Sequence, residues 1–193
     1  VTTIKVGTHV THWSVTTEDY IVSWAQGLDN AKIQVSNNGQ DFVEVDVSAH
    51  VSATTTSIRN IAYGNGLWVA VGDEETILKS TDGFDWQEVT VPASLQLHNL
   101  TALEFSSASN VWYIGGRQYA GGSTTANHLV AFNADLSASE DLGQISTHGI
   151  YGIVPVNGQV YVSANYGRLF VGNDTSTLSN INLTQSAFSN QID

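Results

Sequence analysis

The sequence predicts an all-β protein made of four copies of one four-stranded antiparallel unit. Short runs rich in Val, Ile, Leu and aromatic residues alternate with turn dipeptides such as Asn65-Gly66 and Asp82-Gly83, which favour tight reversals. The pattern recurs about every 40 to 50 residues, as expected of a repeat protein. Helical spacing of apolar residues is not found in the sequence, and only Pro92 and Pro155 interrupt the runs. We therefore expect almost no helix.

The first two copies are the clearest. The second spans residues 58–92, and its four apolar runs are separated by three turns, at Asn65-Gly66, Gly72-Asp73 and Asp82-Gly83. The first spans residues 12–48. Its turn Ser36–Phe42 matches the turn Ser80–Trp86 position by position, with Phe in the place of Trp.

The third and fourth copies have drifted further. The third spans residues 98–145 and carries an insertion, residues 116–126, between its second and third strands. The fourth spans residues 148–184 and has Asn157-Gly158 at the first hairpin. We expect one domain over residues 10–193. Residues 1–9 precede it as a strand that either closes the last unit or tethers the chain to another part.

The segment Ser80-Thr81-Asp82-Gly83-Phe84-Asp85-Trp86 resembles the Asp-box, or BNR, repeat of sialidase-like β-propellers, whose usual pattern is S-x-D-x-G-x-T-W. Here the glycine comes one place early. The resemblance implies a β-propeller of four antiparallel four-stranded blades, either a small closed ring or a segment of a larger propeller. It also implies a structural role at the blade periphery for the turn residues, which are Ser36, Gly39, Phe42, Ser80, Asp82, Gly83, Trp86 and Asp174.

Composition excludes several kinds of partner and site. The formal net charge is -12 with only six Lys and Arg, so the clustered positive charge that nucleic acids and anionic membranes require is missing. Without cysteine the chain has neither disulfides nor a thiol nucleophile. Only 12% of residues are charged, which favours an extracellular or virion surface. We expect no metal and no cofactor.

Aligning the copies places four nitrogen-bearing residues at the start of the innermost strands: His12, Arg59, His98 and His148. Converging there, they could hold an anion or a carboxylate, and the imidazoles could ligate a metal. Alternatively, they cap the strand entries by bonding to loop carbonyls. The insertion offers a second candidate surface through Arg117 and Tyr119, because binding residues concentrate on irregular segments of rigid scaffolds.

The repeat type decides the expected function. Blades like Ile61–Gly72 resemble those of bacterial surface proteins and of phage virion and tail proteins. This implies a non-enzymatic interaction module of a virion, tail or extracellular assembly, with other protein subunits as partners. The alternative is a lectin-like propeller that binds surface glycans. A sialidase-like glycoside hydrolase is less supported, because the chain lacks an F-R-I-P-like motif, two of the six blades and a Tyr-Glu pair at a recognisable spacing.

Overall fold

Over the residues that the structure describes, the fold is all-β, with four antiparallel four-stranded sheets. A computed structural model describes residues 12–15, 21–24, 31–38, 40–51, 57–96, 98–118, 127–146, 149–165, 167–174 and 184–185. Its two single-turn 3-10 helices are η1 (Ser48–His50) and η2 (Ala93–Leu95). Among the described residues, no helix has the length and apolar character needed to cross a bilayer.

Each sheet is a meander whose strands pair in chain order. Sheet 1 contains β1 (His12–Val15), β2 (Ile21–Trp24), β3 (Lys32–Ser36) and β4 (Val43–Asp46). Sheet 2 contains β5 (Ile58–Gly64), β6 (Leu67–Gly72), β7 (Ile77–Ser80) and β8 (Gln87–Glu88). Sheet 3 contains β9 (His98–Ser106), β10 (Val111–Gln118), β11 (Asn127–Asn133) and β12 (Ser139–Ser146). Sheet 4 contains β13 (Ile150–Val156), β14 (Gln159–Ala164), β15 (Arg168–Asn173) and β16 (Thr184–Gln185). The predicted four antiparallel units are confirmed.

The predicted turn dipeptides account for the hairpins. Asn65 and Gly66 have φ of 50° and 74°, and Asn157 and Gly158 have 52° and 74°. Two consecutive left-handed residues make the hairpin turn whose twist matches that of the flanking strands, and Asn and Gly adopt this conformation at low cost. The first hairpins of sheets 2 and 4 are therefore closed by the same local chemistry.

Three apolar clusters of described residues hold the sheets to one another. Ile33 and Val35 of sheet 1 pack with Trp68 and Leu78 of sheet 2. The next cluster joins sheets 2 and 3, with Val69, Ile77, Trp112, Val130 and Phe132 among its members. The last joins sheets 3 and 4, with Tyr113, Leu129, Ile153, Val162 and Phe170 among its members. Sheets 2 and 3 thus bury both faces, as expected of stacked sheets that cannot bury either face alone.

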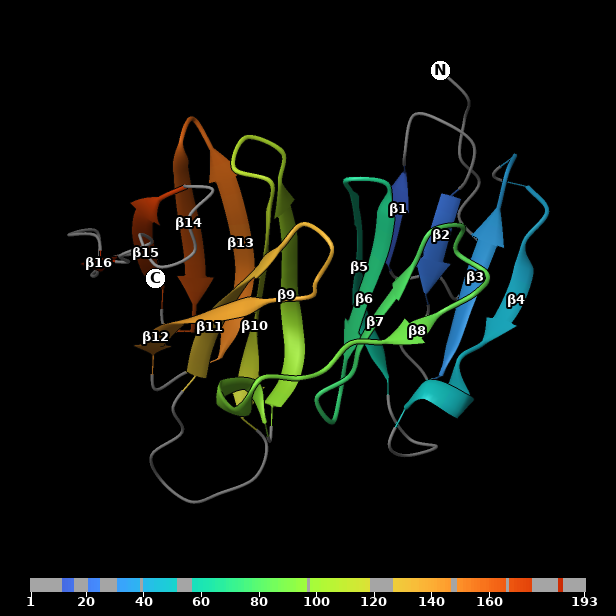
Figure 1. The fold of residues 1–193 in the computed structure, drawn as a ribbon, viewed down its shortest axis with the longest axis horizontal. Coiled ribbons are helices and arrows are strands. Elements are labelled where there is room, and N and C mark those ends of the chain that lie inside the picture. The colour runs from blue at the N-terminus through green and yellow to red at the C-terminus, as the bar shows by residue number, and fades with distance from the viewer. Residues whose placement is uncertain are drawn as a thin grey trace.

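The first strands of the sheets lie toward the middle of the molecule, whereas β4 lies at its right edge and β16 at its left edge (Figure 1). β1 packs against β5, β5 against β9, and β9 against β13. Among the described strands, β13 and β1 are not packed side by side in this way. The close approach at β9 requires Gly116, because a Cβ there would lie 2.2 Å from the Asn99 carbonyl oxygen.

Candidate functional site

Arg59, the cation predicted to bind anions, is already paired. It lies on β5, and its Nε and Nη2 donate to the two carboxylate oxygens of Asp73, which follows β6. The Nη2–Oδ2 distance is 2.9 Å, and the two groups are partly buried. Two parallel charge-assisted hydrogen bonds fix the guanidinium and neutralise its charge. An incoming anion would therefore compete with Asp73 for Arg59.

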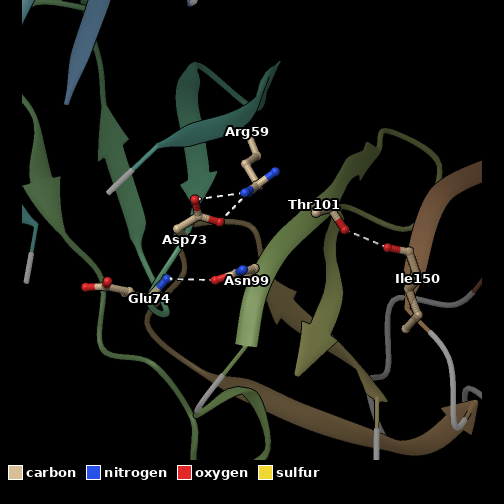
Figure 2. A network of polar contacts seen from close by, with 6 residues as sticks. All are labelled: Arg59, Asp73, Glu74, Asn99, Thr101 and Ile150. Atoms are coloured by element: carbon tan, nitrogen blue, oxygen red, sulfur yellow. Dashed lines mark hydrogen bonds and ion pairs between the residues drawn. The ribbon is translucent and has the colours of Figure 1, made fainter. Parts of the chain in front are cut away.

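The turn that presents Asp73 is held in an unusual conformation. Glu74 and Glu75 have φ of 51° and 68°, a region that costs a non-glycine residue about 1–2 kcal/mol. The Glu74 backbone N–H donates to Asn99 Oδ1 at 3.3 Å, which ties the turn to sheet 3 (Figure 2). The Asp73 backbone N–H donates to the Ser57 carbonyl at 2.9 Å. These bonds position the carboxylate toward Arg59.

Further polar contacts connect the inner strands in series. Asn60 Nδ2 on β5 donates to the Thr101 carbonyl on β9 at 3.3 Å. Thr101 Oγ1 donates in turn to the Ile150 carbonyl on β13 at 2.6 Å (Figure 2). These contacts satisfy backbone groups between neighbouring sheets and set how the sheets pack. We therefore interpret these contacts between the described residues as holding the sheets together rather than as binding a ligand.

The predicted ring of equivalent residues does not follow from the strand register. Ile58, Leu100 and Ile150 pair at equivalent points of the first hairpins, opposite Gly72, Gly116 and Ala164. Arg59 is therefore equivalent to Thr101 and Tyr151. In this register His98 lies three residues before Thr101, so Arg59 and His98 do not occupy equivalent positions.

The other predicted ligand residues are described only in part. His12 is the first residue of β1 and His98 the first residue of β9, and the structure describes the backbone of both but not their side chains. His148 and Tyr119 also lie outside them. Arg117 is on β10 and its side chain is exposed. Among the described residues, no group of three or more His, Asp or Glu side chains is arranged to hold a metal.

The turn after β7 is closed by hydrogen bonds from the side chains of Asp82, Ser80 and Trp86. Asp82 Oδ1 accepts from the backbone N–H groups of Phe84 at 2.8 Å and Asp85 at 2.9 Å. These bonds hold the pKa of Asp82 below its usual value. Ser80 Oγ accepts from the Gly83 N–H at 2.9 Å, and Trp86 Nε1 donates to the Gly83 carbonyl at 2.7 Å.

The turn after β3 repeats these bonds with an asparagine. Asn38 Oδ1 accepts from the backbone N–H groups of Gln40 at 2.8 Å and Asp41 at 2.9 Å, and the Asn38 N–H donates to Ser36 Oγ at 3.3 Å. Phe42 does not share the burial of its counterpart: it is 36% exposed, whereas Trp86 is 4% exposed. Phenylalanine lacks the ring N–H with which Trp86 is anchored. Gly39 lies outside the described residues.

Asp174 is bonded in a different way from Asp82. Its carboxylate accepts hydrogen bonds from three hydroxyls of sheet 3 and the turn after β9: Ser106, Ser109 and Tyr113. Burial, reinforced by Asp174, raises the pKa of Tyr113 well above its usual value, so the phenol stays a donor. Asp174 therefore fastens sheet 4 to sheet 3.

Two further features were not anticipated from the sequence. His128 Nδ1 lies 2.9 Å from Asp141 Oδ2 on the adjacent strand β12. A pocket of about 320 Å³ lies between sheets 2 and 3. Its lining includes Lys79, Glu88, Thr90, Phe132, Ser137 and Ser139. Lys79 Nζ at this pocket donates to the Asp135 carbonyl at 2.9 Å.

No protein-family model and no curated protein matches the chain. Solved structures do match its fold. The computationally designed protein Ika4 has a TM-score of 0.62 at 14% identity, covering 89% of this chain and 95% of Ika4. The extracellular domain of BT4673 from B. thetaiotaomicron has a TM-score of 0.66 at 13% identity, covering 93% of this chain and 22% of that one. YCF48 from Cyanidioschyzon merolae has a TM-score of 0.57 at 9% identity, covering 88% of this chain and 56% of YCF48.

The chain thus spans nearly all of Ika4, about half of YCF48 and about a fifth of BT4673. The last two are propeller-like, with multiple antiparallel sheets. At such low identities the similarity concerns the fold alone.

Proposed function

We propose that this chain is a non-enzymatic β-propeller interaction module, a structural or attachment component of a virion, a tail or an extracellular surface assembly. Its four stacked four-stranded sheets and the propeller-like solved structures support the propeller assignment. The bonding of Asp82 and Asn38 in equivalent turns supports Asp-box-type repeats. On this proposal the sheets are rigid blades whose surfaces contact other protein subunits.

One observation carries the proposal of a protein partner. Two valines on sheet 4 face solvent, Val154 at 57% and Val156 at 44% exposure. Both lie on strand β13, two residues apart and on one face of sheet 4, so they belong to a preformed surface rather than to a loop. Clustered apolar exposure on a rigid surface is typical of protein contacts, and glycans are usually bound by polar groups and exposed aromatic faces.

The described residues give less support to catalysis. Tyr113 lies opposite Glu104 in the β9–β10 ladder, a Tyr-Glu pairing that sequence spacing did not reveal. However, Tyr113 is fully buried and donates to Asp174, so a substrate would have no path to its hydroxyl. Its raised pKa also opposes formation of the phenolate that a nucleophile requires.

A lectin-like function is the second candidate, and the pocket between sheets 2 and 3 favours it. The pocket is lined by the hydroxyl-bearing residues Thr90, Ser137 and Ser139 together with the apolar Val89, Phe132 and Leu136, and Ser137 Oγ donates to Asp135 Oδ1 at 2.7 Å. Its volume of about 320 Å³ is at the lower end of the range for small-molecule sites. Such a site fits one neutral sugar ring better than a long oligosaccharide.

Glycan-array binding and fluorogenic glycoside hydrolysis by the full chain distinguish these functions. The proposal predicts neither saturable glycan binding nor turnover. Saturable binding that is lost in Ser137→Ala but retained in Ser107→Ala, an exposed serine outside the pocket, would establish the lectin instead. Turnover abolished by one carboxylate substitution would establish an enzyme. Arg117→Ala on the same array tests whether the exposed Arg117 side chain contributes to glycan binding.

A further inference from the structure

Sheet 4 has one face packed on sheet 3 and another that faces away from it. Ile153, Val162 and Phe170 belong to the cluster shared with sheet 3. Strand alternation and the ladder pairs Val154–Tyr161 and Tyr161–Val171 place other side chains on the opposite side. We call this opposite side the outer face of sheet 4; its apolar residues are Val154, Val156, Tyr161, Leu169 and Val171.

The outer face uses the positions that bury apolar side chains in the preceding sheets. Tyr161 occupies the position of Val69 in sheet 2 and Tyr113 in sheet 3, according to the ladder registers. Both equivalents are completely buried against the next sheet. Tyr161 itself is only half-buried, and its hydroxyl donates to Gln159 Oε1 at 2.6 Å.

A second set of equivalent positions shows the same difference. Leu169 pairs opposite Ser163, as Ile77 pairs opposite Val71 and Leu129 opposite Gly115. Ile77 and Leu129 are buried, whereas Leu169 is half-buried. At these positions the outer face carries apolar side chains like those of an inter-sheet surface, with the polar Gln159, Ser163 and Asn173 on the same face, and the described part of the chain places no sheet upon it.

Charge indicates which surface can cover this face. Each chain carries a formal charge of -12, so two copies repel one another. The repulsion is weakest when the two copies meet through a surface without carboxylates. The five apolar residues of the outer face bring no charge into it. The far side of sheet 1 is different: Lys32 Nζ lies 2.7 Å from Glu44 Oε1, and Gln34 Nε2 donates to Glu44 Oε2 at 3.2 Å.

A head-to-tail contact would place the apolar outer face against the Lys32–Glu44 pair and desolvate both charges. A contact between two outer faces buries apolar groups on both sides. The same patch then serves both copies, as in a two-fold symmetric dimer, the commonest oligomer of soluble proteins.

We propose that two copies of this chain associate back to back through the outer faces of sheet 4. Tyr161 anchors the contact at its centre, and Val154 and Val156 supply the exposed apolar area. This inference rests on the proposed function, since it identifies a second copy as a protein partner. Raising the salt concentration should strengthen the dimer by screening the repulsion between the two acidic chains.

Sedimentation velocity of the full chain tests the inference, over roughly 1 to 100 µM and at low and high salt. We expect a concentration-dependent shift from monomer to dimer, with a larger dimer fraction at high salt. Val154→Glu should leave the protein monomeric at all concentrations, because dimerisation would bury an unpaired charge. The substitution does not affect the core, since Val154 is exposed. Phe84→Glu is the matched control: it also replaces an exposed apolar residue, on the turn after β7, and should dimerise like the wild type.

Val154→Ser is a second variant that removes apolar area without adding charge, and it should lower the dimer fraction by a smaller amount. Circular dichroism confirms that each variant is folded. A wild type that stays monomeric at all concentrations overturns the inference. So does a dimer that survives Val154→Glu and is lost in Gln34→Arg, which would indicate head-to-tail contact. If the chain is monomeric and binds no glycan, only the dimer is refuted, and the proposed interaction module must bind a different protein. Glycoside turnover would refute the proposed function itself.

Discussion

Tyr113 on sheet 3 donates its phenolic hydrogen bond to Asp174 of sheet 4 at 2.8 Å. The residues are 61 positions apart, so the bond joins two repeats rather than completing a turn. Because the raised pKa keeps the phenol protonated, the bond persists across the physiological pH range. The carboxylate, which the repeat pattern assigned to its own turn, instead fastens one sheet to the next.

Removing the Asp174 carboxylate should destabilise the protein. Asp174→Ala leaves the hydroxyls of Ser106 and Tyr113 buried without their acceptor, at a cost of roughly 3 kcal/mol in the free energy of unfolding. Asp174→Asn keeps one oxygen acceptor and should cost about half as much. Urea unfolding measures both. Equal stabilities for the two variants would contradict this account of Asp174.

The turn after β7 should tolerate asparagine, because Asn38 makes equivalent bonds in the first copy. Asp82→Ala removes the acceptor for two backbone N–H groups and should cost about 1 kcal/mol, as for loss of a helix cap. Asp82→Asn keeps the acceptor and should cost less. The pKa of folded Asp82 lies below the unfolded value of 3.8, so its stabilisation is present above that value and lost as pH falls through the folded pKa.

The advantage of wild type over Asp82→Ala should therefore shrink on acidification. The stability of Asp82→Asn relative to Asp82→Ala should change little, since neither side chain titrates. Urea unfolding between about pH 2 and pH 7 checks this difference. A constant gap between wild type and Asp82→Ala across that range would refute the role of the ionised carboxylate.

A double-mutant cycle on Arg59 and Asp73 should reveal coupling. Arg59→Met keeps the aliphatic stem but leaves the partly buried carboxylate unpaired, so each single change should cost about 2 kcal/mol. We expect a coupling energy of roughly 1–2 kcal/mol. The exposed Lys32–Glu44 pair is the matched control, and its cycle should give less than about 0.5 kcal/mol. Equal coupling in the two cycles would argue against a structural role for the Arg59 pair.

Glu104 should make stability fall as pH rises. Burial raises its pKa above the usual 4.5, so the folded state holds its proton more tightly than the unfolded state does. The stabilisation is full below the unfolded pKa and is lost as pH rises through the folded pKa. Glu104→Gln should therefore gain stability relative to wild type between about pH 4 and pH 7, by less than about 1 kcal/mol because solvent screens the group. Chemical unfolding of wild type and Glu104→Gln at about pH 4 and about pH 7 measures this difference in the free energy of unfolding.

Much of the fold could be predicted because its signals are local. Asn65-Gly66 and Asn157-Gly158 specify their hairpins within four residues, and alternation in the flanking strands specifies the sheets. The bonds within the Ser80–Trp86 turn are local in the same sense. The four sheets and their turns were therefore accessible from the sequence.

The candidate site was less accessible because it depends on register and long-range packing. The ladders of β5, β9 and β13 each carry a β-bulge at the same point, and in this register Arg59 is equivalent to Thr101 rather than to His98. The His128–Asp141 pair depends on the register between β11 and β12, where the ladder also shifts. Such offsets depend on bulges and loop lengths that sequence periodicity does not specify.

Hydrogen–deuterium exchange of the full chain, compared at about 1 µM and about 100 µM, tests most directly whether the chain acts through protein contact at the outer face of sheet 4. The account predicts slower exchange at the higher concentration in peptides covering β13, β14 and β15. It predicts unchanged exchange in β3 and β4, on the charged side of sheet 1. Protection in β3 and β4, or exchange independent of concentration throughout the chain, would contradict it.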